Sequence, residues 1–79
     1  MRIQLFDRGT AKGKQLFSDL EIACQRLQID WDPEYVKDMS KVFNMGVQGN
    51  TVLLIDGEVA IVDKYPSSKE LETIISEYV

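Results

Sequence analysis

Histidine is absent from this chain of 79 residues, and cysteine occurs once, at Cys24. Histidine is the commonest metal ligand and the commonest general base near neutral pH, so the usual components of both kinds of site are missing. A single cysteine cannot form an internal disulfide bond. We therefore expect no bound metal, no cofactor and no covalent cross-link in this protein.

Basic residues and long apolar runs are also scarce. Nine Lys and Arg residues face thirteen Asp and Glu residues, a formal net charge of -4 that argues against nucleic acids and anionic membranes as partners. No apolar run approaches the roughly 18 residues of a membrane span. The first residues lack the basic region and apolar core of a secretory signal. These absences predict a cytoplasmic protein, which we also expect to be a monomer.

The composition that remains is that of a globular protein, with 44% hydrophobic and 28% charged residues. A chain of this length forms one domain, here residues 1–79, and buries only about 60% of the surface that its unfolded state exposes. No linker, internal repeat or low-complexity segment divides it.

The first half of the chain alternates between strand and helix patterns. Arg2–Phe6 predicts a strand with at least one buried face, and apolar residues at helical spacing predict a helix over residues 11–28. Trp31–Val36 contains Pro33 and indicates a short edge strand. Asp38 is expected to cap a short helix that ends near Met45, before Gly46.

The second half predicts a hairpin and a final helix. Thr51–Ile55 and Glu58–Val62 are apolar, β-branched runs joined by Asp56-Gly57, a pair that suits a type I′ turn. After Pro66, Ser67 and Glu70 form a capping box for a helix with one apolar face. The element order is therefore β-α-β-α-β-β-α, which predicts a four-stranded mixed sheet with helices on both faces.

Two segments carry a resemblance to a known family. Ile3–Leu16 and Gly46–Gly57 resemble the two motif regions of small archaeal and bacterial thioredoxin- or glutaredoxin-like proteins, often called redox-active disulfide protein 2. Members of this family have Gly-Cys-x-x-Cys after the first strand and Gly-Val-x-x-Thr-Pro-Ala-Leu-x-Ile-x-Gly in the second segment. The resemblance extends over essentially the whole chain and implies a thioredoxin-like α/β fold.

The chain departs from the family at both redox elements. The resemblance places Thr10 and Gly13 at the two cysteine positions, and Asn50-Thr51 at the Thr-Pro pair whose proline is normally cis. Thiol exchange needs an attacking thiolate and a resolving sulfur, and no histidine is present to activate the Thr10 hydroxyl. A cis bond before a residue other than proline costs about 2.5 to 4 kcal/mol, so we expect Asn50-Thr51 to be trans. The resemblance therefore implies a member without dithiol chemistry, although a residual oxidoreductase role stays open.

Two binding hypotheses follow for the altered site. In the first, the former substrate groove presents a surface to a protein or peptide, and that surface is lined by Arg8, Gly9, Thr10, Lys12, Gly49 and Asn50. In the second, a small anion binds where Arg8, Lys12 and Lys14 surround the start of the first helix, with Thr10 as its N-cap. The alternative to the first hypothesis is a loop that has lost its function. The alternative to the second is that Lys12 and Lys14 point into solvent and bind nothing.

Other residues have a structural and a functional interpretation. Cys24 lies on the apolar stripe of the first helix, where we expect core packing rather than redox chemistry. The alternating Asp30, Asp32 and Glu34 are expected to protect an edge strand rather than to bind a divalent metal. An apolar group beside the altered loop is either core or a partner-binding patch, namely Met39, Phe43, Met45 and Val47.

Overall fold

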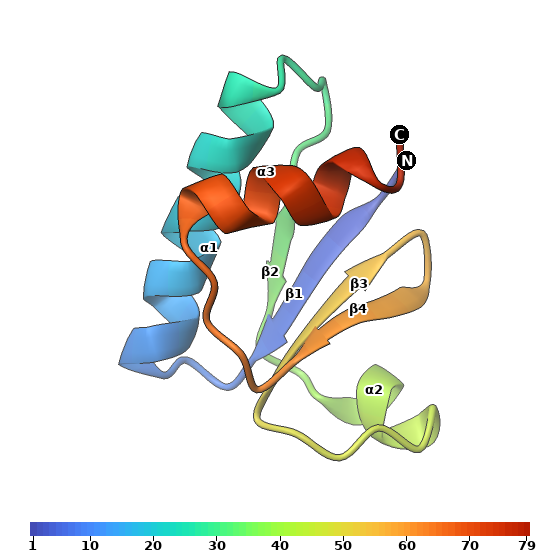
Figure 1. Ribbon diagram of the computed structural model, residues 1–79. Helices are drawn as coiled ribbons and strands as arrows, with labels where there is room; N and C mark the ends of the chain where they lie inside the picture. The colour runs from blue at the N-terminus through green and yellow to red at the C-terminus, as the bar shows by residue number, and fades with distance from the viewer.

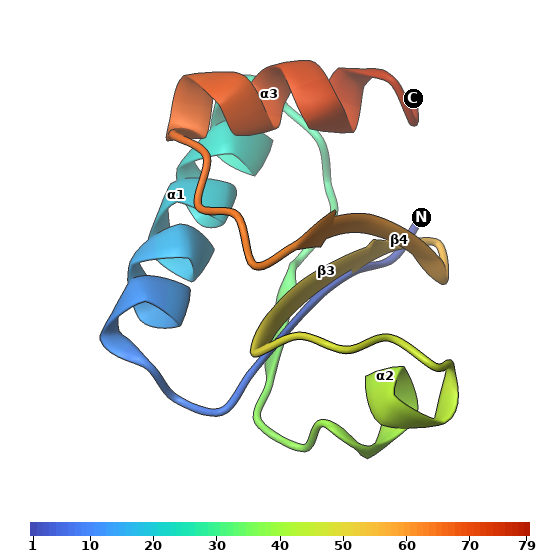
Figure 2. The ribbon, with the colours of Figure 1, turned by 60° about the horizontal axis from the view of Figure 1, so that its bottom comes forward.

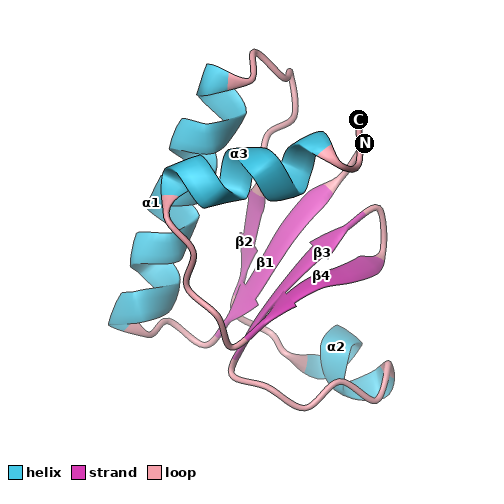
Figure 3. Ribbon diagram, viewed as in Figure 1, coloured by secondary structure: helices cyan, strands magenta, loops and turns pink.

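The computed structural model describes residues 1–79 and has the predicted order of elements (Figure 1, Figure 3). The strands are β1 (Ile3–Asp7), β2 (Glu34–Val36), β3 (Thr51–Ile55) and β4 (Glu58–Val62). The helices are α1 (Ala11–Arg26), α2 (Ser40–Asn44) and α3 (Ser68–Ser76). None of the three helices has the length and apolar character that a bilayer crossing requires.

The four strands form one mixed sheet in the order β2-β1-β3-β4. β1 runs parallel to β2, with Phe6 opposite Val36, and antiparallel to β3, with Asp7 opposite Thr51. β3 and β4 form the predicted hairpin, in which Asp56 and Gly57 both have positive φ angles. The prediction of β2 as an edge strand is confirmed.

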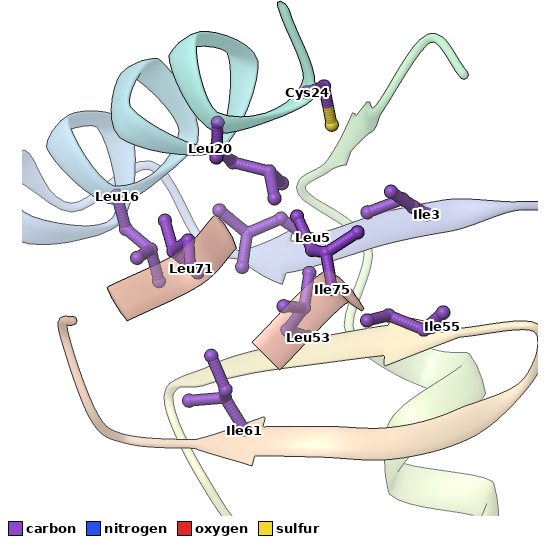
Figure 4. Close-up of a cluster of buried hydrophobic side chains, with 11 residues drawn as sticks. Ile3, Leu5, Leu16, Leu20, Cys24, Leu53, Ile55, Ile61, Leu71 and Ile75 are labelled. Carbon is purple, nitrogen blue, oxygen red and sulfur yellow. The ribbon is translucent and has the colours of Figure 1, made fainter. Parts of the chain in front are cut away.

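Helices cover both faces of the sheet, as predicted (Figure 2). α1 and α3 pack together over one face. Their apolar side chains contact every second residue of the strands, and together these side chains form the larger of two core clusters (Figure 4). The opposite face is covered by α2, where Val42 joins the smaller core cluster with Phe6, Val52 and Leu54. Burial on both faces explains why all five residues of β1 are buried.

Local sequence signals fix the helix ends. The Thr10 hydroxyl accepts a hydrogen bond from the Gly13 amide at the start of α1. Ser67 and Glu70 form the predicted capping box of α3. α1 ends at Arg26, earlier than the predicted Gln28, because Gln28 adopts a φ of +54° that no α-helix continues.

In the segment around α2, one expectation is wrong and one pair of alternatives is decided. Asp38 does not cap the helix; its carboxylate instead accepts hydrogen bonds from the amide and hydroxyl of Ser40 in a local turn, and Met39 is the N-cap residue. Of the two interpretations of the apolar group beside the altered loop, core packing does not hold for Phe43 and Met45, whose exposed fractions are 72% and 44%. Only Val42 of this short helix is fully buried, because one turn brings a single side chain fully onto the sheet.

Candidate functional site

The candidate site lies where β1 ends and α1 begins. Because β3 is antiparallel to β1, its first residue, Thr51, pairs with Asp7 at the end of β1. The loop of Arg8, Gly9 and Thr10 therefore meets Asn50 and Thr51, which are distant in the sequence. This juxtaposition of the two altered segments agrees with the arrangement that the family resemblance implies.

A buried carboxylate, that of Asp7, organises this region. Asp7 has no exposed surface, and its Oδ2 accepts hydrogen bonds from the Gly9 amide at 3.0 Å and the Thr10 amide at 2.8 Å. Three hydroxyls also donate to Asp7, those of Thr10 at 2.9 Å, Thr51 at 2.8 Å and Tyr35 at 2.6 Å. The carboxylate thus connects the end of β1 to the start of α1, to β2 and to β3.

These donors keep Asp7 ionised despite its burial. Burial alone raises the pKa of Asp7, but the hydrogen bonds from Tyr35, Thr51, Thr10 and Gly9 outweigh it and lower the pKa to about 2. Burial together with the hydrogen bond to Asp7 raises the pKa of Tyr35 to about 12. At neutral pH the pair is therefore a carboxylate accepting a hydrogen bond from a neutral phenol.

Gly13 is packed directly against this carboxylate. A Cβ atom at Gly13 would overlap the carboxyl carbon and both oxygens of Asp7, so any side chain at position 13 requires Asp7 to move. Gly13 also donates its amide to the Thr10 hydroxyl at 3.0 Å. Thr10 and Gly13, the positions that the resemblance assigns to cysteine, are thus both part of the Asp7 hydrogen-bonded network.

The segment before β3 is held by a second carboxylate. Asp63 Oδ1 accepts hydrogen bonds from the amides of Asn50 at 2.8 Å and Thr51 at 3.0 Å. Every peptide bond in the structure is trans, which confirms the expectation for Asn50-Thr51. The Thr51 hydroxyl lies 3.0 Å from the Tyr65 hydroxyl, so a chain of hydrogen bonds runs from Asp7 to a partly exposed tyrosine.

A surface groove borders the network. One depression of about 420 Å³ brings Arg8, Gly49 and Asn50 together with the apolar side chains of Met39, Val42, Phe43 and Val47; Gln48 and Asp63 complete its lining. A neighbouring depression shares Arg8, Met39 and Phe43 and continues to Lys37, Asp38, Ser40 and Asn44. We call the two together the α2 groove.

Half of the predicted binding residues line the α2 groove. Gly9 and Thr10 instead donate to Asp7, and the Lys12 ammonium lies 5.5 Å from the centre of the Tyr65 ring in a separate depression. The amides of Gly9, Thr10 and Gly13 already have acceptors, which leaves fewer free N–H groups for the anion that the second hypothesis requires.

The residues that hold the site together have no recognisable motif in the sequence, namely Asp7, Tyr35, Asp63 and Tyr65. The one available signal was Asp7 itself, a charged residue that directly follows an apolar strand. Cys24, by contrast, has the predicted location in the core, with 3% of its surface exposed, and burial raises the pKa of its thiol. Thiolate formation is therefore disfavoured at this cysteine.

Comparisons with known proteins agree with this fold. Residues 1–76 match the family model described as "Thioredoxin domain". A protein described as "Thioredoxin" from Methanothermobacter thermautotrophicus is 30% identical over 76 residues, which make up 96% of this chain and 99% of that protein. No solved structure matches the chain. The thioredoxin-like fold is thus confirmed, and the chain belongs to the thioredoxin domain family.

Proposed function

We propose that this thioredoxin-family chain is a non-catalytic module that binds a segment of a protein or peptide in the α2 groove. The observation that carries the proposal is Phe43, which is 72% exposed and lines the groove together with Arg8 and Asn50. Aromatic residues are enriched at protein interfaces, so an exposed aromatic side chain beside an apolar groove is a suitable interface anchor.

The chemistry of the groove suits an apolar anchor residue with polar groups around it. Met39, Val42, Phe43 and Val47 provide the apolar contact. Arg8 makes no ion pair within the chain and is free to meet a carboxylate or a backbone carbonyl of the partner. The carboxylates of Asp38 and Asp63 already accept hydrogen bonds from the chain itself, so they contribute less to recognition.

The absence of dithiol chemistry is part of the proposal and is supported by the Asp7 network. We infer that the chain derives from the redox-active disulfide protein 2 type and that Asp7 now occupies the volume beside position 13. Dithiol exchange requires an attacking thiolate and a second, resolving thiol beside it, whereas the one thiol of this chain, that of Cys24, is buried in α1. A carboxylate with five donors is a satisfied structural group rather than a nucleophile.

Selection from a random peptide library on the immobilised protein tests the binding function. Selected peptides should carry an apolar residue and should shift the amide resonances of Phe43, Val47 and Asn50 in a titration of isotope-labelled protein. Phe43→Ser should weaken binding at least tenfold, since a central aromatic anchor contributes about 2 kcal/mol or more. Ile22→Ser, at a half-exposed apolar residue of α1, is the matched control and should bind normally.

Reduction of insulin disulfides with dithiothreitol as electron donor tests the proposed absence of dithiol chemistry. We expect no rate above that of the reagent alone, and the same result for Cys24→Ser. Turnover that Cys24→Ser abolishes would restore an oxidoreductase role, even if peptides also bind. Selected peptides that map outside the α2 groove, or bind Phe43→Ser equally well, would contradict the binding site.

A further inference from the structure

A second groove lies between α1 and β2, which run beside each other along one margin of the sheet (Figure 1). It has a volume of about 320 Å³ and is lined by Lys14 and Phe17 of α1, by Tyr35 of β2 and by Lys37 just after β2. The rings of Phe17 and Tyr35 meet edge to face with 5.4 Å between their centres. We call it the lysine–aromatic groove.

The charge of this groove is opposite to that of the chain. Its lining contains two lysines and no carboxylate, although the protein carries a net charge of -4. Neither Lys14 nor Lys37 takes part in the two ion pairs of the structure. The Asp7 carboxylate is buried and accepts a hydrogen bond from the Tyr35 hydroxyl, and the Asp38 carboxylate accepts hydrogen bonds from Ser40. Two cations therefore flank an aromatic surface without an internal partner.

The groove also borders an unpaired strand edge. β2 is the outer strand of the sheet and is hydrogen-bonded only to β1, so its other side has no strand beside it. Such an edge can accept the backbone of an extended peptide. The two ends of this edge carry opposite charge, because Asp30 and Asp32 precede β2 while Lys37 follows it. Glu34, within β2, is already paired with Arg2 at 3.0 Å.

We propose that the lysine–aromatic groove binds an extended segment of a partner protein that carries an aromatic residue with carboxylates on one side of it. The aromatic side chain lies against Phe17 and Tyr35, and the carboxylates reach Lys14 and Lys37. Asp30 and Asp32 repel acidic residues at the opposite end of the edge, which selects segments whose acids are grouped. This site shares only Lys37 with the α2 groove, and the proposal does not depend on binding there.

The open shape of the site favours a peptide over a free small molecule. Sites for small ligands enclose most of the ligand surface, whereas this groove is shallow and lies at the margin of the sheet. A peptide gains the missing contacts from its backbone along β2. A single aromatic carboxylate in solution has no such additional contacts.

Three capped peptides test the proposal by titration of isotope-labelled protein. The first is Gly-Ser-Phe-Asp-Glu, the second replaces its acids to give Gly-Ser-Phe-Asn-Gln, and the third separates them as Asp-Ser-Phe-Gly-Glu. The first should shift the amides of Lys14, Phe17, Tyr35 and Lys37, and the second should bind about fivefold more weakly, as two exposed ion pairs predict. The affinity of the third peptide should lie between those of the first and the second. Raising the salt from about 50 to about 500 mM should weaken binding of the first peptide most and leave binding of the second, which has no acidic side chain, nearly unchanged.

Variants identify the groups responsible. Lys14→Gln with Lys37→Gln should reduce the affinity of the first peptide to that of the second, and both lysines are exposed, so the fold is preserved. Lys69→Gln, at an exposed lysine of α3, is the matched control and should have no effect. Equal affinity for all three peptides would overturn the proposal, and so would shifts confined to residues of the α2 groove that the lysine–aromatic groove does not share, such as Phe43 and Val47. Shifts of the same four residues with protein concentration alone would assign the groove to a second copy and would also overturn it.

Discussion

The carboxylate of Asp7 fills the space into which a side chain at Gly13 would project. Both residues are buried, and both bond to Thr10, Asp7 through its two oxygens and Gly13 through its amide. Asp7 and Gly13 are therefore complementary, because the charged side chain at the strand end requires the missing side chain in the first turn of α1. The site has a filled and satisfied interior, which is the property expected of a stable binding surface.

Acid should destabilise the protein through Asp7. The folded-state pKa of about 2 lies below the ordinary value of 3.8, so Asp7 stabilises the fold above about pH 4, and this contribution falls as the pH drops from about 4 to about 2. At neutral pH the lowered pKa of Asp7 contributes about 2 kcal/mol to the free energy of unfolding. Urea unfolding at several pH values should show this pH-dependent component in the native protein and its loss in Asp7→Asn. Asp32→Asn, at an exposed site, should keep it.

Removing the Tyr35 hydroxyl should weaken the same network. Tyr35→Phe keeps the aromatic contact with Phe17 but removes the 2.6 Å hydrogen bond to Asp7. Hydrogen bonds to charged groups contribute about 1.5 to 3 kcal/mol, and unfolding free energies should fall by that amount. The pKa of Asp7, followed by carboxyl carbon NMR, should rise. Tyr78→Phe, at a partly buried tyrosine after α3, is the control; an equal loss there would show that the hydroxyl of Tyr35 has no special role.

The thiol of Cys24 should react only when the protein unfolds. Burial, and to a lesser extent Glu21, raises the pKa of the thiol, so native protein contains little reactive thiolate and exposes little sulfur. A bulky aromatic disulfide reagent should modify the unfolded chain in urea rapidly and the native chain only at the rate of opening. Rapid stoichiometric modification of native protein would contradict the core position.

Local patterns predicted most of the fold because their causes are local. Asp56-Gly57 sets its own turn, Ser67 and Glu70 cap their own helix, and the apolar spacing of α1 identifies its buried face. Apolar spacing could not decide burial in α2, because one turn of helix has too few contacts to bury all of its apolar residues. Phe43 has the spacing of a core residue, but only Val42 of α2 is fully buried.

The site could not be predicted to the same extent because its bonds are long-range. Tyr35 and Thr51 reach Asp7 across 28 and 44 positions, and neither has a sequence feature that distinguishes it from an ordinary strand residue. The family resemblance identifies Thr10 and Gly13 but not the Asp7 carboxylate that contacts both of them. A charged residue directly after an apolar strand, when followed by glycine and threonine, was the only indication.

A double-mutant cycle on Asp7 and Gly13 measures whether the Asp7 carboxylate occupies the space beside position 13. Glycine to alanine in a helix ordinarily stabilises by about 1 kcal/mol. In the native background Gly13→Ala should instead destabilise by about 1 to 3 kcal/mol, because the new methyl group displaces the carboxylate. In the Asp7→Gly background the same change should be neutral or stabilising. A Gly13→Ala effect of the same sign and size in both backgrounds would show that Asp7 does not occupy the space beside position 13.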